Sequence, residues 1–217
     1  MGETQQGRQG EAVFRPIVAF DFDGTLTCRD SFTAFLAWRS GARRYVTGFV
    51  ALAPAALGYL RHRDRGRLKA AAVAQFLKGA KRADVEREAQ AFAKECARAL
   101  FRPDAIRAWR RWQTAGARLL IVTATPDLIV APFARGLGAQ MLIGTRLAVD
   151  RDGRLTGALD GANCRGPEKA RRLREEFGED IALEAAYGDS SGDREMLNLA
   201  EERGMKVFNG KGGARGA

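Results

Sequence analysis

The sequence predicts an α/β fold, in which helices cover both faces of a parallel sheet and a helical segment is inserted after the first strand. Short apolar runs alternate with helical patterns over most of the chain, which is typical of strand–helix–strand units. The interval from about Asp30 to Pro103 breaks this alternation and contains only helical patterns. We therefore expect a three-layer sheet core with an inserted helical cap.

The predicted strands are short apolar runs, and three of them end next to polar residues. Buried parallel strands have this nearly continuous apolar character. The three runs are Ile17–Phe20 before Asp21, Ala117–Val122 before Thr123, and Ile181–Tyr187 before Gly188 and Asp189. Further strands are predicted at Met141–Ile143 and Lys206–Phe208, and a hairpin at Arg146–Asp150 and Leu155–Leu159 with Gly153 in its turn.

Helical patterns fill the remaining sequence and divide it into regions. In the core they are Ala105–Ala115, Asp127–Gly136, Glu168–Phe177 and Asp193–Arg203. In the insertion they are Ser31–Arg39, Ala42–Leu60, Arg67–Leu77 and Asp84–Leu100. We expect a core domain of residues 14–29 and 105–209, a cap domain of residues 30–104, a disordered leader at 1–13 and a flexible tail at 210–217.

Composition indicates a soluble globular protein with a basic cap. The 217 residues are 46% hydrophobic and 29% charged, and the net charge is +10. Between Asp30 and Asp104, 15 Lys and Arg stand against 7 Asp and Glu, so this segment carries nearly all of the excess. Such a surface favours an acidic partner. Without a nucleic-acid-binding motif or interleaved aromatic residues, we expect an anionic membrane surface rather than nucleic acid.

The cysteine and histidine residues limit the catalytic mechanisms that the chain can use. Cys28, Cys96 and Cys164 have no metal-site or redox spacing, and the first dozen residues lack a signal-peptide pattern. We therefore expect a cytoplasmic protein. Peripheral binding to the inner face of the cell membrane is a further expectation. His62 is the only histidine. A histidine nucleophile, a Ser-His-Asp triad and a histidine-rich metal site are therefore excluded as the main mechanism.

Carboxylates follow two of the predicted strands. Asp21 and Asp23 come directly after the first strand, whereas Asp189 and Asp193 follow the third. Ligands of open α/β sheets bind beyond the carboxyl ends of the strands. Acidic residues gathered there repel one another unless a cation lies between them, and hard oxygen ligands suit Mg²⁺. For the first pair alone, an ordinary polar turn is the alternative.

Two further residues are candidates for phosphate binding. Thr123 closes the second strand, where a hydroxyl can bind a phosphate oxygen, although threonine often ends strands for other reasons. Lys169 lies at the start of a predicted helix, where the helix dipole disfavours a cation unless an anion is near. A solvated lysine is the alternative for this residue alone.

Taken together and in this order, these segments resemble the four motifs of the haloacid dehalogenase (HAD) superfamily. The matching segments are Asp21-Phe22-Asp23-Gly24-Thr25, Thr123, Lys169, and Asp189 with Asp193. The resemblance covers residues from about Phe14 to Phe208 and implies a Rossmann-like core. It also implies a phosphatase, because relatives that cleave carbon–halogen bonds lack the second aspartate that Asp23 supplies.

The resemblance implies a role for each matched residue. Asp21 is the expected nucleophile on phosphorus, and Asp23 the general acid and base. Mg²⁺ is expected to be held by Asp21, Asp189 and the backbone carbonyl of Asp23, with Asp193 ordering the metal site. Thr123, Lys169 and Gly24 are expected to bind the phosphoryl oxygens, and Thr25 to hold the loop. The expected substrate is a phosphomonoester.

The cap gives two further expectations. An insertion at this point resembles the cap of the phosphoserine-phosphatase-like branch (subfamily IB). Asp30 lies nine residues after the nucleophile, where that branch carries a glutamate that binds the substrate amine. Asp30 is therefore a candidate substrate residue, and the alternative is that it caps the helix beginning at Ser31.

The uncharged run Tyr45–Leu60 is flanked by basic residues and is too short to span a bilayer. It is either a buried cap helix or an element that lies in a membrane interface. The cap resembles that of the HAD-type bacterial phosphatidylglycerophosphatase, which implies a phospholipid phosphate as substrate. A soluble small-molecule phosphatase and a catalytically silent phosphate binder remain alternatives, although the intact motifs argue against the silent binder.

Overall fold

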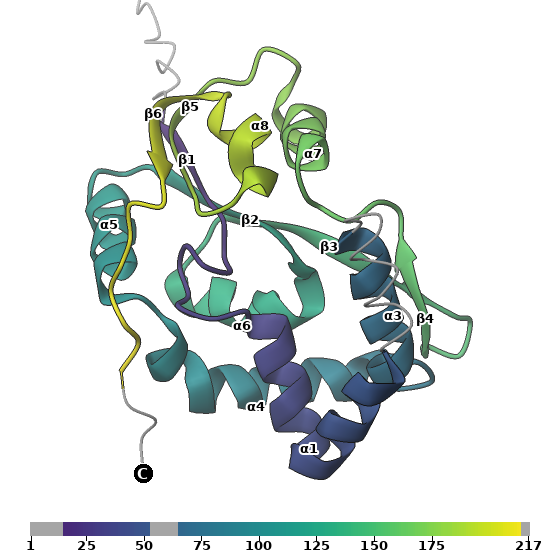
Figure 1. Cartoon of the computed structure of the whole chain (residues 1–217). Helices are drawn as coiled ribbons and strands as arrows, with labels where there is room; N and C mark the ends of the chain where they lie inside the picture. The colour runs from purple at the N-terminus through teal and green to yellow at the C-terminus, as the bar shows by residue number, and fades with distance from the viewer. Residues whose placement is uncertain (1–14, 53–64, 214–217) are drawn as a thin grey trace, which may run out of the picture.

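The computed structural model describes residues 15–52 and 65–213 (Figure 1). The predicted leader, the second half of the run Tyr45–Leu60, His62 and residues 214–217 lie outside these ranges. The strands are β1 (Ile17–Phe20), β2 (Arg118–Pro126), β3 (Met141–Val149), β4 (Leu155–Asp160), β5 (Leu183–Gly188) and β6 (Ala200–Met205). They form one sheet in the order β4-β3-β2-β1-β5-β6, in which only the β3–β4 pair is antiparallel.

Helices cover both faces of this sheet, which confirms the predicted three-layer fold. Because side chains alternate along β1, Val18 and Phe20 pack on one face and Ala19 on the other. The first face is covered by α5 (Pro103–Thr114) and α6 (Asp127–Leu137), and the second by α7 (Pro167–Phe177) and the short α8 (Arg194–Leu197). In Figure 1, α5 and α7 lie on opposite sides of the strands.

Three described helices lie between β1 and α5, and we call them the cap helices. They are α1 (Ser31–Ala51), α3 (Arg65–Leu77) and α4 (Arg82–Leu100). At Gly41 (φ 70°, ψ 159°) the path of α1 breaks, close to the predicted gap between two helices. Phe92 of α4 packs edge-on against Phe35 of α1 and Phe133 of α6. The core of the cap is therefore continuous with the first face of the sheet.

Two predictions near the C-terminus are wrong in whole or in part. The helix predicted at Asp193–Arg203 covers only Arg194–Leu197, and the strand predicted at Lys206–Phe208 is not present. Instead a 3₁₀ turn (Ser191–Asp193) and α8 are followed by β6, which pairs in parallel with β5. Only Ala200 and Gly204 are buried along β6. Backbone pairing at the edge of the sheet overrides the helical propensity of this charged segment, because its polar side chains can remain in solvent.

The other strands differ from expectation mainly in their ends. The predicted strand at Met141–Ile143 and the first hairpin strand are one continuous strand, β3, and the hairpin with β4 is present. Pairing continues along β2 past Thr123 to Pro126, with a register shift on the way. Because of this extension, Thr123 and Thr125 are part of β2 and lie at the end of the sheet where β1 and β5 also stop.

Candidate active site

The structure brings two of the predicted site residues, Asp21 and Asp193, together around one buried lysine. Lys169 lies in the first turn of α7 and is 1% exposed. Its Nζ donates hydrogen bonds to Asp21 Oδ1 at 2.6 Å, to Asp193 Oδ1 at 2.8 Å and to the carbonyl oxygen of Val122 at 2.5 Å. A single ammonium group therefore joins the residue after β1 and the middle of β2 to the segment that follows β5.

Burial and charge shift the titration of this pair. Burial raises the pKa of Asp21 to about 7, although the neighbouring Lys169 acts in the opposite direction. For Lys169, burial alone would lower the pKa, but the carboxylates of Asp21 and Asp193 raise it above its ordinary value. Lys169 is therefore charged, and its charge offsets only part of the effect of burial on the carboxyl of Asp21.

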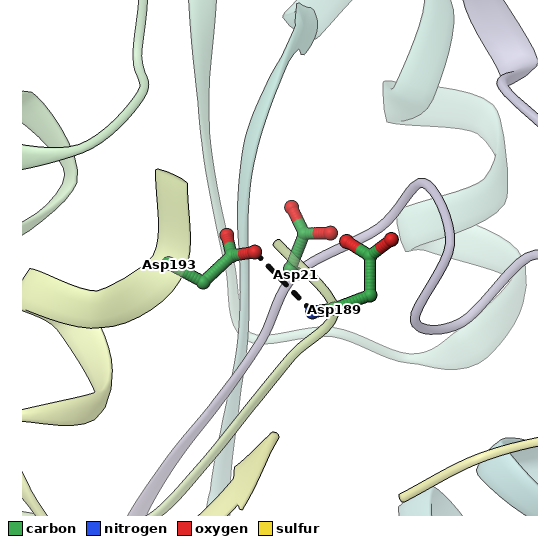
Figure 2. Close-up of side chains that lie close together, drawn as sticks. All are labelled: Asp21, Asp189 and Asp193. Atoms are coloured by element: carbon green, nitrogen blue, oxygen red, sulfur yellow. Dashed lines mark hydrogen bonds between the residues drawn. The ribbon is translucent and has the colours of Figure 1, made fainter. Parts of the chain in front are cut away.

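Three carboxyl groups, those of Asp21, Asp189 and Asp193, lie close together at this site (Figure 2). Oxygens of Asp21, Asp189 and Asp193 lie within 4.8 Å of one another. Asp193 Oδ2 accepts hydrogen bonds from the backbone N–H of Asp189 and from the N–H and hydroxyl of Ser190. Burial would raise the pKa of Asp193, but Lys169 and these donors lower it. Donors therefore engage both oxygens of Asp193, and the hydrogen bonds to Oδ2 tie its carboxylate to the backbone of the Asp189–Ser190 segment.

The donor set fits Mg²⁺. The cluster holds three carboxylates, and the ammonium group of Lys169 pairs with two of them, so the cluster carries excess negative charge when all three are ionised. Burial and the charge of Asp193 raise the pKa of Asp189. Hard oxygen ligands of this kind suit Mg²⁺, and a divalent cation removes the repulsion between them.

Gly24 makes room for Asp189 in the loop after β1. Its φ is +85°, and a Cβ at this position would overlap the carboxylate of Asp189. Glycine is therefore required both for the backbone conformation and for the close approach. Next to it, the hydroxyl of Thr25 donates to Asp21 Oδ2 at 3.3 Å. The loop thus fixes Asp21 through one residue and accommodates Asp189 through another.

Asp23 lies in a separate hydrogen-bonding environment. Its Oδ1 accepts the backbone N–H of Ser31 at 2.7 Å, and its Oδ2 accepts the hydroxyl of Thr125 at 2.5 Å. Burial, followed by the charge of Asp30, raises the pKa of Asp23. Sequence reasoning missed Thr125, because it placed the end of the second strand at Val122 and the contact joins residues 102 positions apart.

Thr123 and Asp30 both line the same cavity as the carboxylates. Thr123 is 1% exposed, and its hydroxyl accepts the N–H of Thr125 at 3.1 Å. Asp30 Oδ1 accepts the N–H of Thr33 at 2.7 Å, the geometry of a helix N-cap at the start of α1. Asp30 therefore caps α1, which was one of its two interpretations from the sequence, and it also lines the cavity.

The cavity, of about 690 Å³, lies between the strand ends and the cap helices. Its wall on the cap side is apolar and contains Phe32, Leu36, Leu52, Leu68 and Ala72. Sequence reasoning missed several cations that line the cavity, among them Lys69 and Arg102. Lys69 Nζ, from α3, donates to the carbonyl oxygen of Ala124 in β2 at 2.5 Å. In the sequence, Lys69 stands among several basic residues, so its position gave no separate signal.

Comparison with known proteins agrees with this geometry. The sequence profile of the haloacid dehalogenase-like hydrolase family matches residues 18–198. Protein CicA of Caulobacter vibrioides is 60% identical over 203 residues, covering 93% of this chain and 91% of CicA. Phosphoserine phosphatase SerB1 of Mycobacterium tuberculosis is 38% identical over 88 residues, covering 39% of this chain and 28% of SerB1.

Solved structures share the fold at lower identity. A protein of unknown function from Bordetella pertussis has a TM-score of 0.73 and 24% identity, covering 87% of this chain and 88% of that one. A phospho-aspartyl intermediate analogue of phosphoserine phosphatase has a TM-score of 0.59 and 20% identity, covering 89% and 88%. The profile match spans most of the chain and contains the clustered aspartates and Lys169. The chain therefore belongs to the haloacid dehalogenase-like hydrolase family.

Proposed function

We propose that this hydrolase is a Mg²⁺-dependent phosphomonoester phosphatase in which Asp21 is the nucleophile. The observation that carries the proposal is the position of Asp21, hydrogen-bonded to Lys169 and lining the cavity beside Asp189. The phosphatases among the relatives support the same class of reaction.

In the first step, a carboxylate oxygen of Asp21 forms a bond to phosphorus while the bond from phosphorus to the ester oxygen breaks. The leaving oxygen takes a proton from the carboxyl of Asp23. In the second step, Asp23 removes a proton from water as the water oxygen attacks the aspartyl phosphate, which releases phosphate and regenerates Asp21. The raised pKa of Asp23 suits a group that must hold a proton and then accept one.

Lys169 and Thr123 are proposed to orient and neutralise the phosphoryl oxygens, together with the backbone at Gly24. Asp21, Asp189 and the backbone carbonyl of Asp23 are the proposed Mg²⁺ ligands, and Asp193 orders them through its hydrogen bonds. When bound, Mg²⁺ would neutralise negative charge on the phosphoryl group and the carboxylates. We assign Thr25 a supporting role in holding the Asp21 carboxylate.

As substrate we propose a phospholipid phosphate such as phosphatidylglycerophosphate, in line with a place in subfamily IB. The apolar cap wall of the cavity supports this choice, because an amphiphilic substrate carries apolar groups near its phosphate. On the second half of α1, Val46 and Val50 are 59% and 70% exposed and lie near the exposed Arg43 and Arg44. Apolar and basic side chains together suit an anionic membrane surface.

Membrane contact would be peripheral, on the cytoplasmic side, through the basic cap of residues 30–104. Over the part of the chain that the structure describes, no helix is both long and apolar enough to cross a bilayer. The second candidate is a soluble phosphatase of the phosphoserine phosphatase type, which the similarity to SerB1 favours. Asp30 would then be available at the cavity to bind a substrate amine.

The experiment is phosphate release from phosphatidylglycerophosphate in mixed micelles with Mg²⁺. Phosphoserine and p-nitrophenyl phosphate are assayed in parallel, and Asp21→Asn is the control. Selective lipid hydrolysis that Asp21→Asn abolishes is the expected result. Hydrolysis of the small esters alone would contradict the lipid substrate but keep the mechanism. No release from any substrate would contradict the proposed phosphatase activity and favour a silent phosphate binder.

A further inference from the structure

The two chain segments that connect the cap helices to the sheet lie side by side. The N–H of Cys28 donates to the carbonyl oxygen of Leu100 at 2.8 Å, and the N–H of Arg102 donates to that of Leu26 at 2.9 Å. An antiparallel bridge joins the same two segments between these bonds. A movement of the cap helices relative to the sheet would therefore act on this paired linker.

The side chain of Arg102 extends from the linker in two directions. Its Nε donates to the carbonyl oxygen of Gly24 at 3.1 Å, and its Nη1 donates to the carbonyl oxygen of Gly210 at 2.9 Å. Arg102 also lines the cavity. Because this group is planar and its donors have fixed directions, the two bonds hold the two carbonyl groups in a defined relation.

The backbone at Gly24 lies next to two of the carboxylates of the site. A Cβ on Gly24 would overlap the carboxylate of Asp189, and the next residue, Thr25, donates to Asp21. The carbonyl that Arg102 holds belongs to the peptide between Gly24 and Thr25. A rotation of this peptide would shift the contacts to Asp21 and Asp189 together.

At the C-terminus, residues 209–213 lie against the linker, and we call them the C-terminal strap. Asp104 Oδ2 accepts the N–H groups of Asn209 and Gly210 at 2.7 and 2.9 Å. The N–H of Gly213 donates to the carbonyl oxygen of Arg98 at 3.0 Å. The strap therefore contacts the linker region at both of its ends.

Glycine at position 212 permits this close contact. A Cβ there would overlap the carbonyl oxygen of Ala99 and would lie 3.1 Å from Cys28 Sγ. Ala99 belongs to α4 and Cys28 to the other connecting segment, so Gly212 touches both sides of the paired linker. A side chain at this position has to displace the strap, because the opposing atom in α4 is backbone.

We infer that Arg102 is a positioning residue through which the C-terminal strap holds the catalytic loop at Gly24. The inference rests on the proposed function for its effect on turnover. Arg102 acts on the reacting groups through the Gly24–Thr25 peptide rather than by contact with the phosphoryl group. The alternative, in which Arg102 binds the substrate directly, is an outcome of the test.

The first test is a double-mutant cycle of Arg102→Met and Gly212→Val, assayed on p-nitrophenyl phosphate. We expect each variant to lower kcat about tenfold with little change in KM, because a small misplacement of catalytic groups slows the chemical step. The double variant should be no slower than the slower single variant, since both remove the same coupling. A rise in KM without loss of kcat, or multiplied effects in the double variant, would overturn the inference.

Two variants serve as matched controls. Arg107→Met removes the same charge from an exposed position on α5, and Gly136→Val adds the same side chain at an exposed site in α6 where a Cβ meets open space. Both should keep kcat within about twofold of the wild type, as surface substitutions usually do.

The second test does not depend on activity. Hydrogen exchange is compared for peptides covering residues 22–27 in the wild type, Gly212→Val and Gly136→Val. Faster exchange of this loop in Gly212→Val alone is expected, because the strap no longer supports Arg102. Faster exchange confined to residues 98–104 and the strap would overturn the coupling. If the wild type hydrolyses none of the esters, the proposed function fails, whereas the exchange comparison still decides the coupling.

Discussion

Lys169 places its Nζ 2.6 Å from Asp21 Oδ1, so a lysine at the start of α7 contacts the carboxylate that follows β1. Both side chains are almost entirely buried. The same ammonium group lies 2.8 Å from Asp193 Oδ1. Two buried carboxylates therefore depend on one cation, and this dependence gives the first prediction.

Lys169→Met should destabilise the protein strongly when Mg²⁺ is absent. Removing one partner of a buried ion pair leaves uncompensated charge and typically costs about 3 kcal/mol or more. Mg²⁺ should restore part of this loss, because it neutralises the same carboxylates. Urea unfolding with EDTA and with Mg²⁺ measures both effects. Equal stability of the variant and the wild type in EDTA would contradict the electrostatic role of Lys169.

Asp23→Asn should reduce turnover most for esters with poor leaving groups. An alkyl phosphate needs a proton on its leaving oxygen, whereas p-nitrophenolate leaves without one. A loss of about 100-fold or more is expected for the alkyl ester and a clearly smaller loss for p-nitrophenyl phosphate in the first step. Burst kinetics separate that step from hydrolysis of the intermediate. A uniform loss in the first step would show that Asp23 is not the general acid.

Gly24→Ala should weaken Mg²⁺ binding, because the added Cβ would overlap the carboxylate of Asp189. The matched control is Gly153→Ala, in the β3–β4 hairpin, where φ is also positive (+73°) but a Cβ meets open space. Both variants carry similar backbone strain, so only the contact with Asp189 differs. The measurement is the rise in Tm on adding Mg²⁺, which should shrink in Gly24→Ala only. An equal rise in both would place the metal away from this loop.

Glu168→Gln gives a prediction about pH. Hydrogen bonds from Arg171 and Arg172 lower the pKa of Glu168 to about 2. A carboxylate with a lowered pKa in the folded state adds stability above its unfolded pKa of about 4.5, and this is lost as the pH falls through about 2. Because Arg171 is half exposed, we expect a loss of only about 1 kcal/mol at pH 7.

The difference in free energy of unfolding between the wild type and Glu168→Gln should therefore be larger at pH 7 than at pH 3. Urea titrations at the two pH values measure it. A difference that grows as the pH falls would contradict the assigned direction of the shift.

Val46→Glu with Val50→Glu should reduce binding to anionic liposomes without lowering turnover of p-nitrophenyl phosphate. These two are large apolar side chains of α1 that are exposed to solvent, and a negative charge there would be repelled by the lipid headgroups. Val207→Glu, at a site that is 50% exposed, is the matched control and should bind as the wild type does. Binding of the wild type should also weaken with added salt. Equal liposome binding by all three proteins would argue against contact through α1.

The sequence predicts most of the fold, because strongly apolar strands and periodic helices carry their own signal. β1 and the helices α5, α6 and α7 begin and end within about two residues of their expected positions. β6 was missed for a physical reason. Its residues Glu201, Glu202 and Arg203 favour a helix locally, and only pairing with β5, a tertiary interaction, makes this segment a strand.

The residues of the site likewise divide into those that the sequence predicts and those that it does not. The motif residues were found from their order and from their positions after strands, and the structure brings Asp21, Lys169, Asp189 and Asp193 together. Thr125, Lys69 and Arg102 were missed. Each of them acts through a hydrogen bond to a residue at least 55 positions away, and two of these bonds go to backbone carbonyl groups, which leave no mark on the sequence.

The most direct test of the central claim is chemical identification of the residue that carries phosphate during turnover. The enzyme is mixed with substrate and Mg²⁺, quenched in acid and treated with borohydride, which reduces an aspartyl phosphate to homoserine. Peptide mass spectrometry then locates the change. We predict homoserine at position 21 in the wild type, and none in Asp21→Asn, whose turnover should fall more than about 1,000-fold. Reduction at another residue, or turnover retained by Asp21→Asn, would contradict the claim that Asp21 is the nucleophile.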